Sequence, residues 1–294
     1  MPRGKRLELS PRDIEIFRLL VRYRYLRSSY IHAFVGGASE NRLKERLGDL
    51  FHEGYIGRPD QQWQFANCRH SPAVYQIDAG ARSALQELES TADEPLTWLS
   101  HHGHRQFRHS LMICEVLASI DLGIRQASGV RLISWREILG KSPLAVEQHA
   151  SPFEFSGVRI IPDALFGIEY HSGQKSAYRF CALEVDRGTM PVIRRNPEQS
   201  SYLQKIMGYR SLIDRRSHRT ELGIPNLFVL TVTTSDSHLA GIIQAISDGT
   251  RSHSTFLFKS LCSPAMTEYP PFPRPGLFLD PWRRIDLPPL SLAS

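Results

Sequence analysis

The hydrophobic positions of the first ninety residues predict a small helical unit. Apolar residues recur at three- and four-residue spacing after Ser10, and Pro11 and Asp13 follow Ser10 as they do at a helix start. A second helix is predicted over residues 28–35, and a third begins after Ser39 with its leucines on one face. The chain therefore begins with three short helices.

Two short strands are predicted after the third helix. The chain passes from helix to strand at residues 54–56, continues through a polar turn and forms a second strand over residues 73–77. Three helices followed by a hairpin is the order of a winged helix-turn-helix, whose third helix lies in the DNA major groove. The alternative is a winged helix that binds protein or only separates domains. The residues predicted to contact DNA are Arg42, Lys44, Arg46 and Arg58.

The pattern then changes to an α/β order. Residues 89–100 are polar and acidic and predict a linker, so we place a winged-helix domain at 1–90 and a second domain at 101–294. The second domain begins with a helix over residues 104–126, followed by strands and helices of a mixed sheet, and the fold class is α+β. Strands are predicted at 130–135, 159–169, 177–186, 227–233 and 255–258, and further helices at 200–213 and 237–246.

The composition of the chain favours a protein that binds nucleic acid over one that spans a membrane. The chain has 294 residues and a formal net charge of +6, and most of its positive residues are arginines, which pair with phosphate through two hydrogen bonds. This balance favours a nucleic-acid partner. No segment approaches the roughly 20 apolar residues that cross a bilayer, so no membrane partner is expected. The four cysteines are isolated, which supports neither a disulfide framework nor a zinc knuckle, and a cytoplasmic location is expected.

Three acidic residues are predicted to meet at one end of the second domain's sheet. Asp163 stands at the start of one strand, and the turn over residues 171–176 returns the chain to a strand that ends at Glu184 and Asp186. Residues two apart on a strand share a face, and antiparallel pairing brings Asp163 near Glu184. A few carboxylates plus water bind Mg²⁺, so we predict that Asp163 and Glu184 hold this ion. The alternative is a sheet end whose acids are solvated or paired with arginine.

This arrangement resembles the active site of the PD-(D/E)xK nuclease superfamily. Residues 162–163 match its PD motif, and Glu-Val-Asp at 184–186 lies where the superfamily has (D/E)xK, but Asp186 occupies the lysine position. Some members carry this lysine on the neighbouring helix, and Lys205 fits that place, with Tyr209 one turn later. The resemblance implies a Mg²⁺-dependent DNA endonuclease in which Lys205 stabilises charge on the phosphate. Its implied catalytic residues are Asp163, Glu184, Asp186 and Lys205.

Several motifs in order resemble one family more closely. The predicted winged helix is followed by RHSLMICEV, SWREI, IIPDALF, EVDRGT and KIMGY. Over about residues 8–240 this order resembles the replication-relaxation proteins of bacteria and plasmids. The resemblance implies a winged helix joined to a restriction-endonuclease-like domain. Glu115, on the helix before the sheet, fits the first-helix acid of the PD-(D/E)xK superfamily.

These observations predict a DNA-binding protein of a plasmid or other mobile element. Its expected partner is double-stranded DNA, and its second domain is expected to be nuclease-like and metal-dependent. The main alternative is a non-enzymatic regulator of transcription or replication whose nuclease-like domain is a scaffold. A protein adaptor that binds no DNA is a third hypothesis, and a homodimer is an open alternative for each.

Overall fold

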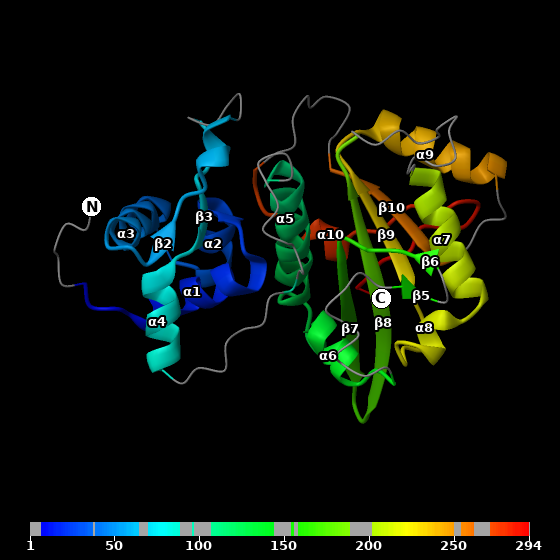
Figure 1. Cartoon of the computed structure of the whole chain (residues 1–294), viewed down its shortest axis with the longest axis horizontal. Helices are drawn as coiled ribbons and strands as arrows, with labels where there is room; N and C mark the ends of the chain where they lie inside the picture. The colour runs from blue at the N-terminus through cyan, green and yellow to red at the C-terminus, as the bar shows by residue number, and fades with distance from the viewer. Residues whose placement is uncertain are drawn as a thin grey trace. The chain divides into compact units, whose positions relative to one another are not determined.

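The computed structural model of the chain contains two compact units (Figure 1). The first comprises Met1–Leu122 with Pro271–Pro275, and the second comprises Gly123–Pro270 with Gly276–Ser294. No helix in the part of the chain that the structure describes is long and apolar enough to cross a membrane. The described residues are 7–37, 39–64, 70–88, 96, 107–143, 154–155, 158–188, 202–249, 254–261 and 271–293, so that all of the expected linker except Leu96 lies outside them.

The first unit combines helices with three short strands. Its elements are α1 (Pro11–Tyr23), β1 (Leu26–Arg27), α2 (Ser28–Val35), α3 (Glu40–His52), β2 (Ile56–Gly57), the 3-10 helix η1 (Asp60–Gln64), β3 (Val74–Ile77), α4 (Ala79–Glu87) and all but the last two residues of α5 (Phe107–Ile124). The strands pair antiparallel in the order β1-β3-β2, so β3 is the central strand. The three predicted helices and the two strands after them are confirmed.

The start of α1 is fixed by residues that the sequence singled out. The Ser10 hydroxyl accepts a hydrogen bond from the Asp13 backbone N–H at 3.3 Å, and the Asp13 carboxylate accepts one from the Ser10 backbone N–H at 2.7 Å. This reciprocal pair is a capping box. The helix then buries Ile16, Phe17 and Leu20 completely. Local sequence thus determines both where α1 begins and which face it buries.

Buried polar contacts hold α5 to the first unit. Arg27 Nε lies 2.6 Å from Glu115 Oε1, and Tyr23 donates a hydrogen bond to Asp121. Residues 107–122 belong to the first compact unit, whereas the predicted boundary places this helix in the second domain, 101–294. An apolar stripe predicts that a helix buries one face, but it does not identify the partner.

The turn between α2 and α3 contains a glycine whose backbone conformation other residues rarely adopt. Gly37 has φ +106°, and a Cβ there would lie 2.6 Å from the Arg12 guanidinium. Gly48, inside α3, would place its Cβ in open space. We predict that Gly37→Ala lowers the free energy of unfolding by about 1–2 kcal/mol, because a positive φ strains L-residues. Gly48→Ala should raise it by about 0.5–1 kcal/mol, because alanine is the better helix former.

Denaturant titration of the two glycine variants beside the wild type measures this contrast. If both variants changed the free energy of unfolding by similar amounts and in the same direction, backbone conformation would not explain why glycine is needed at one position and not at the other.

The second unit is built on a five-stranded mixed sheet. Its elements are β4 (Val130–Ile133), α6 (Trp135–Gly140), β5 (Glu154–Phe155), β6 (Val158–Arg159), β7 (Ala164–Ser172), β8 (Lys175–Asp186), α7 (Tyr202–Asp214), α8 (Ser217–Thr220), β9 (Phe228–Thr233), α9 (Asp236–Gly249), β10 (Phe256–Ser260) and α10 (Gly276–Leu279). The sheet order is β10-β9-β8-β7-β4. Strands β8, β9 and β10 run parallel, whereas β4 and β7 are antiparallel to their neighbours. The predicted α+β class with a mixed sheet is confirmed.

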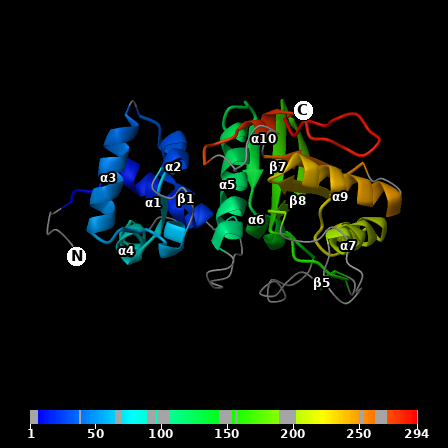
Figure 2. The same cartoon turned by 90° about the horizontal axis from the view of Figure 1, so that it is seen from above.

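Different segments cover the two faces of this sheet (Figure 2). Ala182 and Glu184 of β8 point to the side of α7: Tyr209 of this helix lines one pocket with Ala182 and donates a hydrogen bond to Glu184. Tyr170, on the opposite face, donates a hydrogen bond to the Leu292 carbonyl of the C-terminal segment. The acidic end of β8 therefore lies under the helical layer.

Several strand boundaries differ from the prediction, and two of these differences have a clear local cause. The strand expected at 130–135 ends at Ile133, because Ser134 caps α6 by accepting a hydrogen bond from the Glu137 N–H at 3.1 Å. The strand expected at 159–169 begins only at Ala164, after Pro162. Proline has no N–H to donate to a strand partner, and residues 158–159 instead form β6, which pairs with β5. The predicted hairpin across residues 171–176 is confirmed.

Candidate functional site

A carboxylate, a lysine and a tyrosine meet on the helical side of the sheet. The Glu184 side chain is 3% exposed and forms an ion pair with Lys205 through Oε2. Tyr209 donates a hydrogen bond to Glu184 Oε1 at 2.5 Å. Lys205 and Tyr209 are one turn apart on α7, so both reach β8 from one face of the helix. The structure thus brings Lys205, predicted as the displaced motif lysine, onto Glu184.

The charges of Lys205 and the nearby acids influence one another's pKa values. Burial raises the pKa of Glu184 to about 7, although Lys205 opposes the rise, and the charge of Asp163 adds to it. Burial lowers the pKa of Lys205, but Glu184, Asp163 and Asp186 outweigh burial, and the net pKa of Lys205 is raised. Lys205 is therefore a cation within an acidic cluster, a name used below for Asp163, Glu184 and Asp186.

The raised pKa of Glu184 predicts a pH-dependent contribution to stability. Folding moves the pKa from 4.5 to about 7, so the contribution is largest below the unfolded value and is lost as pH rises through 7. The variant Glu184→Gln has no ionisable group at this position. The free energy of unfolding of the wild type, measured relative to this variant by denaturant titration, should therefore decrease as the pH is raised from about 5 to about 8. A difference that stays constant would contradict the raised pKa.

The other two acids of the cluster have separate donors. Asp163 Oδ2 accepts a hydrogen bond from the Val185 N–H at 2.7 Å. Asp186 Oδ1 accepts one from the Gly188 N–H at 2.8 Å, and its Oδ2 lies 2.8 Å from His238 Nε2 of α9. Asp186, which stands where the motif has lysine, is thus paired with a histidine.

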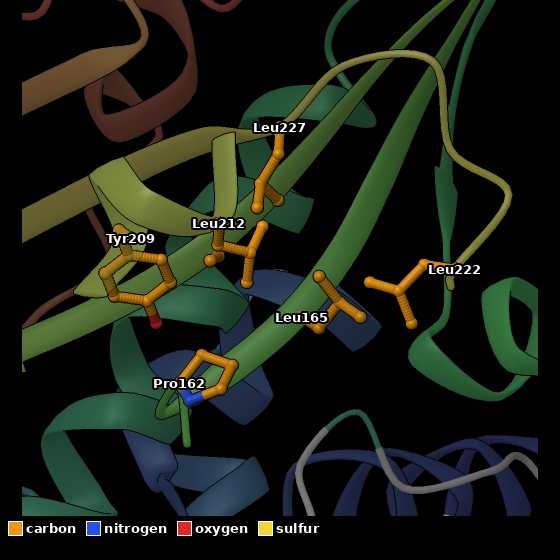
Figure 3. Close-up of a pocket in the computed structure, with 7 residues that line it drawn as sticks. Pro162, Leu165, Tyr209, Leu212, Leu222 and Leu227 are labelled. Atoms are coloured by element: carbon orange, nitrogen blue, oxygen red, sulfur yellow. The ribbon is translucent and has the colours of Figure 1, made fainter. Parts of the chain in front are cut away.

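Tyr209 also lines an apolar pocket (Figure 3). The same residue therefore contacts Glu184 through its hydroxyl and contributes to the pocket. The lining residues are Pro162, Leu165, Ala182, Tyr209, Leu212, Leu222 and Leu227. An apolar lining can exclude water from the acidic cluster, but it offers little to orient a polar ligand.

In this arrangement Glu184 and Asp186 do not fit a bound Mg²⁺. Both oxygens of Glu184 and both oxygens of Asp186 are engaged by protein donors. Mg²⁺ keeps several waters, whereas the side chains of Glu184 and Asp186 are 3% and 6% exposed. Among the described residues, no group of three His, Cys, Asp or Glu side chains is arranged to hold a metal ion. The metal roles of Asp163 and Glu184 stay predictions that these contacts do not favour.

Two of the four basic residues predicted to contact DNA are exposed on α3. Arg42 and Lys44 lie on either side of the buried Leu43, and Lys44 Nζ is 3.2 Å from Glu40 Oε1 one turn earlier. Such an exposed pair contributes little to stability and can be broken by a ligand at small cost. Arg42 and Lys44 are therefore available to a phosphate group.

The other two basic residues have contacts within the unit. Arg46 forms two hydrogen bonds to the buried Asp13 carboxylate, at 3.0 and 2.6 Å. Although burial acts to raise the pKa of Asp13, Arg46 and Ser10 lower it overall. Arg58 lies over the Tyr75 ring, 5.1 Å from its centroid, and donates to its hydroxyl at 2.9 Å. These contacts give Arg46 and Arg58 structural roles in addition to the predicted one.

Comparison with protein families agrees with the order of the motifs. The model described as replication-relaxation matches residues 17–227, which is more than half of the chain. The chain belongs to the replication-relaxation family. Membership gives the protein a role related to replication or relaxation, and the matched residues include the acidic cluster and Lys205. No curated protein and no solved structure matches the chain.

His238 is the residue of the site that sequence analysis missed. It lies beyond residue 227, outside the replication-relaxation match, so no family motif points to it. The available signal is topological. Strands β8 and β9 are parallel neighbours, and the segments that follow such strands lie at one edge of the sheet. The sequence predicted both strands but not their pairing, and only the pairing brings α9 to Asp186.

Proposed function

We propose that this replication-relaxation protein binds double-stranded DNA through its first unit. The observation that carries the proposal is the order α1, α2, α3 and then the paired strands β2 and β3. A winged helix-turn-helix has this order and inserts its third helix in the major groove. In this proposal α3 is the recognition helix.

The contacts of α3 support such a role. Leu43, Leu47 and Leu50 are buried, which turns Arg42 and Lys44 outward. The ion pair between Arg46 and Asp13 ties α3 to the first turn of α1. A helix held in place before binding loses less conformational entropy when it docks. An exposed basic face on a fixed helix is what phosphate and base contacts require.

For the second unit we propose a nuclease-like fold that serves as a scaffold. The contact between Lys205 and Glu184 is the one expected of a PD-(D/E)xK site with a displaced lysine. Because protein donors occupy the carboxylate oxygens, we favour a non-enzymatic regulator of replication or transcription on a plasmid or mobile element. Mg²⁺- or Mn²⁺-dependent cleavage of duplex, nicked or branched DNA, lost in Glu184→Ala, would favour the endonuclease hypothesis instead. A homodimer would be expected to prefer a palindromic site.

Alanine variants of α3 test the proposed interface. In the double variant Arg42→Ala/Lys44→Ala, duplex affinity should fall, and the slope of log affinity against log salt should become shallower by about 2, because two phosphate contacts are lost. Arg82→Ala, an exposed arginine on α4, is the matched control and should leave the slope unchanged. Fluorescence anisotropy of a labelled duplex measures both quantities. Equal slopes for the double variant and the wild type would place the interface elsewhere.

A further inference from the structure

The acidic cluster receives its hydrogen bonds from the protein itself. Glu184 is engaged by Lys205 and Tyr209 of α7. Asp186 is engaged by His238 of α9. Lys205 is also attracted to the other two acids, so one ammonium group compensates charge across the whole cluster.

These donors are held in place by further contacts. The Tyr202 hydroxyl shares a hydrogen bond with Thr231 of β9, which anchors the first turn of α7 beside Lys205. The His238 backbone N–H donates a hydrogen bond to the Ser235 hydroxyl at 3.3 Å, which fixes the first turn of α9. Helices α7 and α9 also pack on each other. Lys205 and His238 therefore approach the acids from adjacent, well-anchored helices.

Buried carboxylates need such partners. Three carboxylates at one sheet end repel one another, and burying an unpaired charge is costly. In a metal site a divalent cation supplies the compensating charge and fills the oxygen lone pairs. Here an ammonium, a phenol hydroxyl and an imidazole fill those positions.

We propose that Lys205 and His238 take the place of a divalent cation, so that the acidic cluster is closed by the protein's own donors and binds Mg²⁺ only when they are removed. An active nuclease can have the same contact between its lysine and a carboxylate. It differs from the proposed arrangement because its wild-type site still binds Mg²⁺. In this protein the ion would have to displace donors on two carboxylates. It would also have to bring its waters to side chains that are 3% and 6% exposed.

Calorimetric titration of MgCl₂ and MnCl₂ into the full-length protein tests this proposal. The wild type should give no saturable binding at millimolar metal. The double variant Lys205→Met/His238→Gln should bind the metal with an affinity at least about tenfold higher than the weakest affinity that the titration of the wild type would detect. Adding Glu184→Gln to that variant should abolish the new binding. Saturable binding by the wild type would overturn the proposal, as would a folded double variant that binds no metal.

The wild-type protein provides a second measurement that does not depend on a variant folding. Thermal unfolding with and without Mg²⁺ detects any ion that binds the native state, because such binding raises the Tm. An unchanged Tm supports the proposal, and a rise that saturates with Mg²⁺ overturns it. Neither measurement uses DNA, so the result is separate from the proposed DNA binding.

Discussion

Replacing Glu184 with alanine is expected to lower the free energy of unfolding by about 3 kcal/mol. The substitution leaves Lys205 without its anion and the buried Tyr209 hydroxyl without its acceptor. Breaking a buried ion pair costs about 3–5 kcal/mol, and the lower end applies because the Lys205 side chain is 30% exposed. Denaturant titration followed by circular dichroism measures this loss.

A surface acid on α7, the helix that carries Lys205, is the matched control for Glu184. Asp214 lies 3.6 Å from Arg210, and its side chain is 55% exposed. Asp214→Ala should therefore cost less than about 0.5 kcal/mol. Replacing the buried pair as a whole, in Glu184→Leu/Lys205→Met, should recover part of the loss. Equal losses for the Glu184 and Asp214 single variants would contradict the buried network.

The second large effect is expected in the first unit, where Arg27→Ala should cost about 3–5 kcal/mol. The side chains of Arg27 and Glu115 are 9% and 0% exposed, and Arg27 also donates to the Pro72 carbonyl at 3.3 Å. Removing Arg27 takes away the buried cation 2.6 Å from the Glu115 carboxylate. Because Glu115 is on α5, the loss should be seen as unfolding of the first unit with this helix.

The variant Glu115→Gln distinguishes the effect of the Glu115 charge from the effect of its side-chain shape in the pair with Arg27. Glu115→Gln keeps the size of the side chain and an acceptor for Arg27, so it should be less destabilising than Arg27→Ala. Lys44→Ala breaks an exposed pair whose side chains are 49% and 45% exposed, and it should change stability by less than about 0.5 kcal/mol. If Arg27→Ala were as mild as Lys44→Ala, α5 would not depend on the buried ion pair.

Features set by local sequence were predictable. The helix start at Ser10 follows from side chains within three residues of it, and the capping box is present. The hairpin across residues 171–176 follows from two apolar runs separated by a polar turn, and the strands pair as expected. Lys205 was predicted from the resemblance and a one-turn helical spacing, and the structure brings it to Glu184.

Features set by tertiary pairing were not predictable in the same way. The apolar face of α5 does not indicate that Glu115 of this helix forms an ion pair with Arg27 of the first unit. Nothing near His238 in the sequence indicates Asp186, which is 52 residues away. Arg46 was predicted as a DNA contact because it is basic and outside the leucine stripe, yet its position also meets Asp13 of α1. Each of these contacts depends on which elements the fold brings together.

The salt dependence of duplex affinity tests the proposed DNA binding most directly. Full-length protein is titrated into a labelled duplex at several salt concentrations between about 50 and 200 mM, with anisotropy as the signal. Phosphate contacts from an exposed basic helix predict that log affinity falls linearly and steeply as log salt rises. Absence of binding at the lowest salt, or an affinity that does not change with salt, would contradict a DNA-binding first unit.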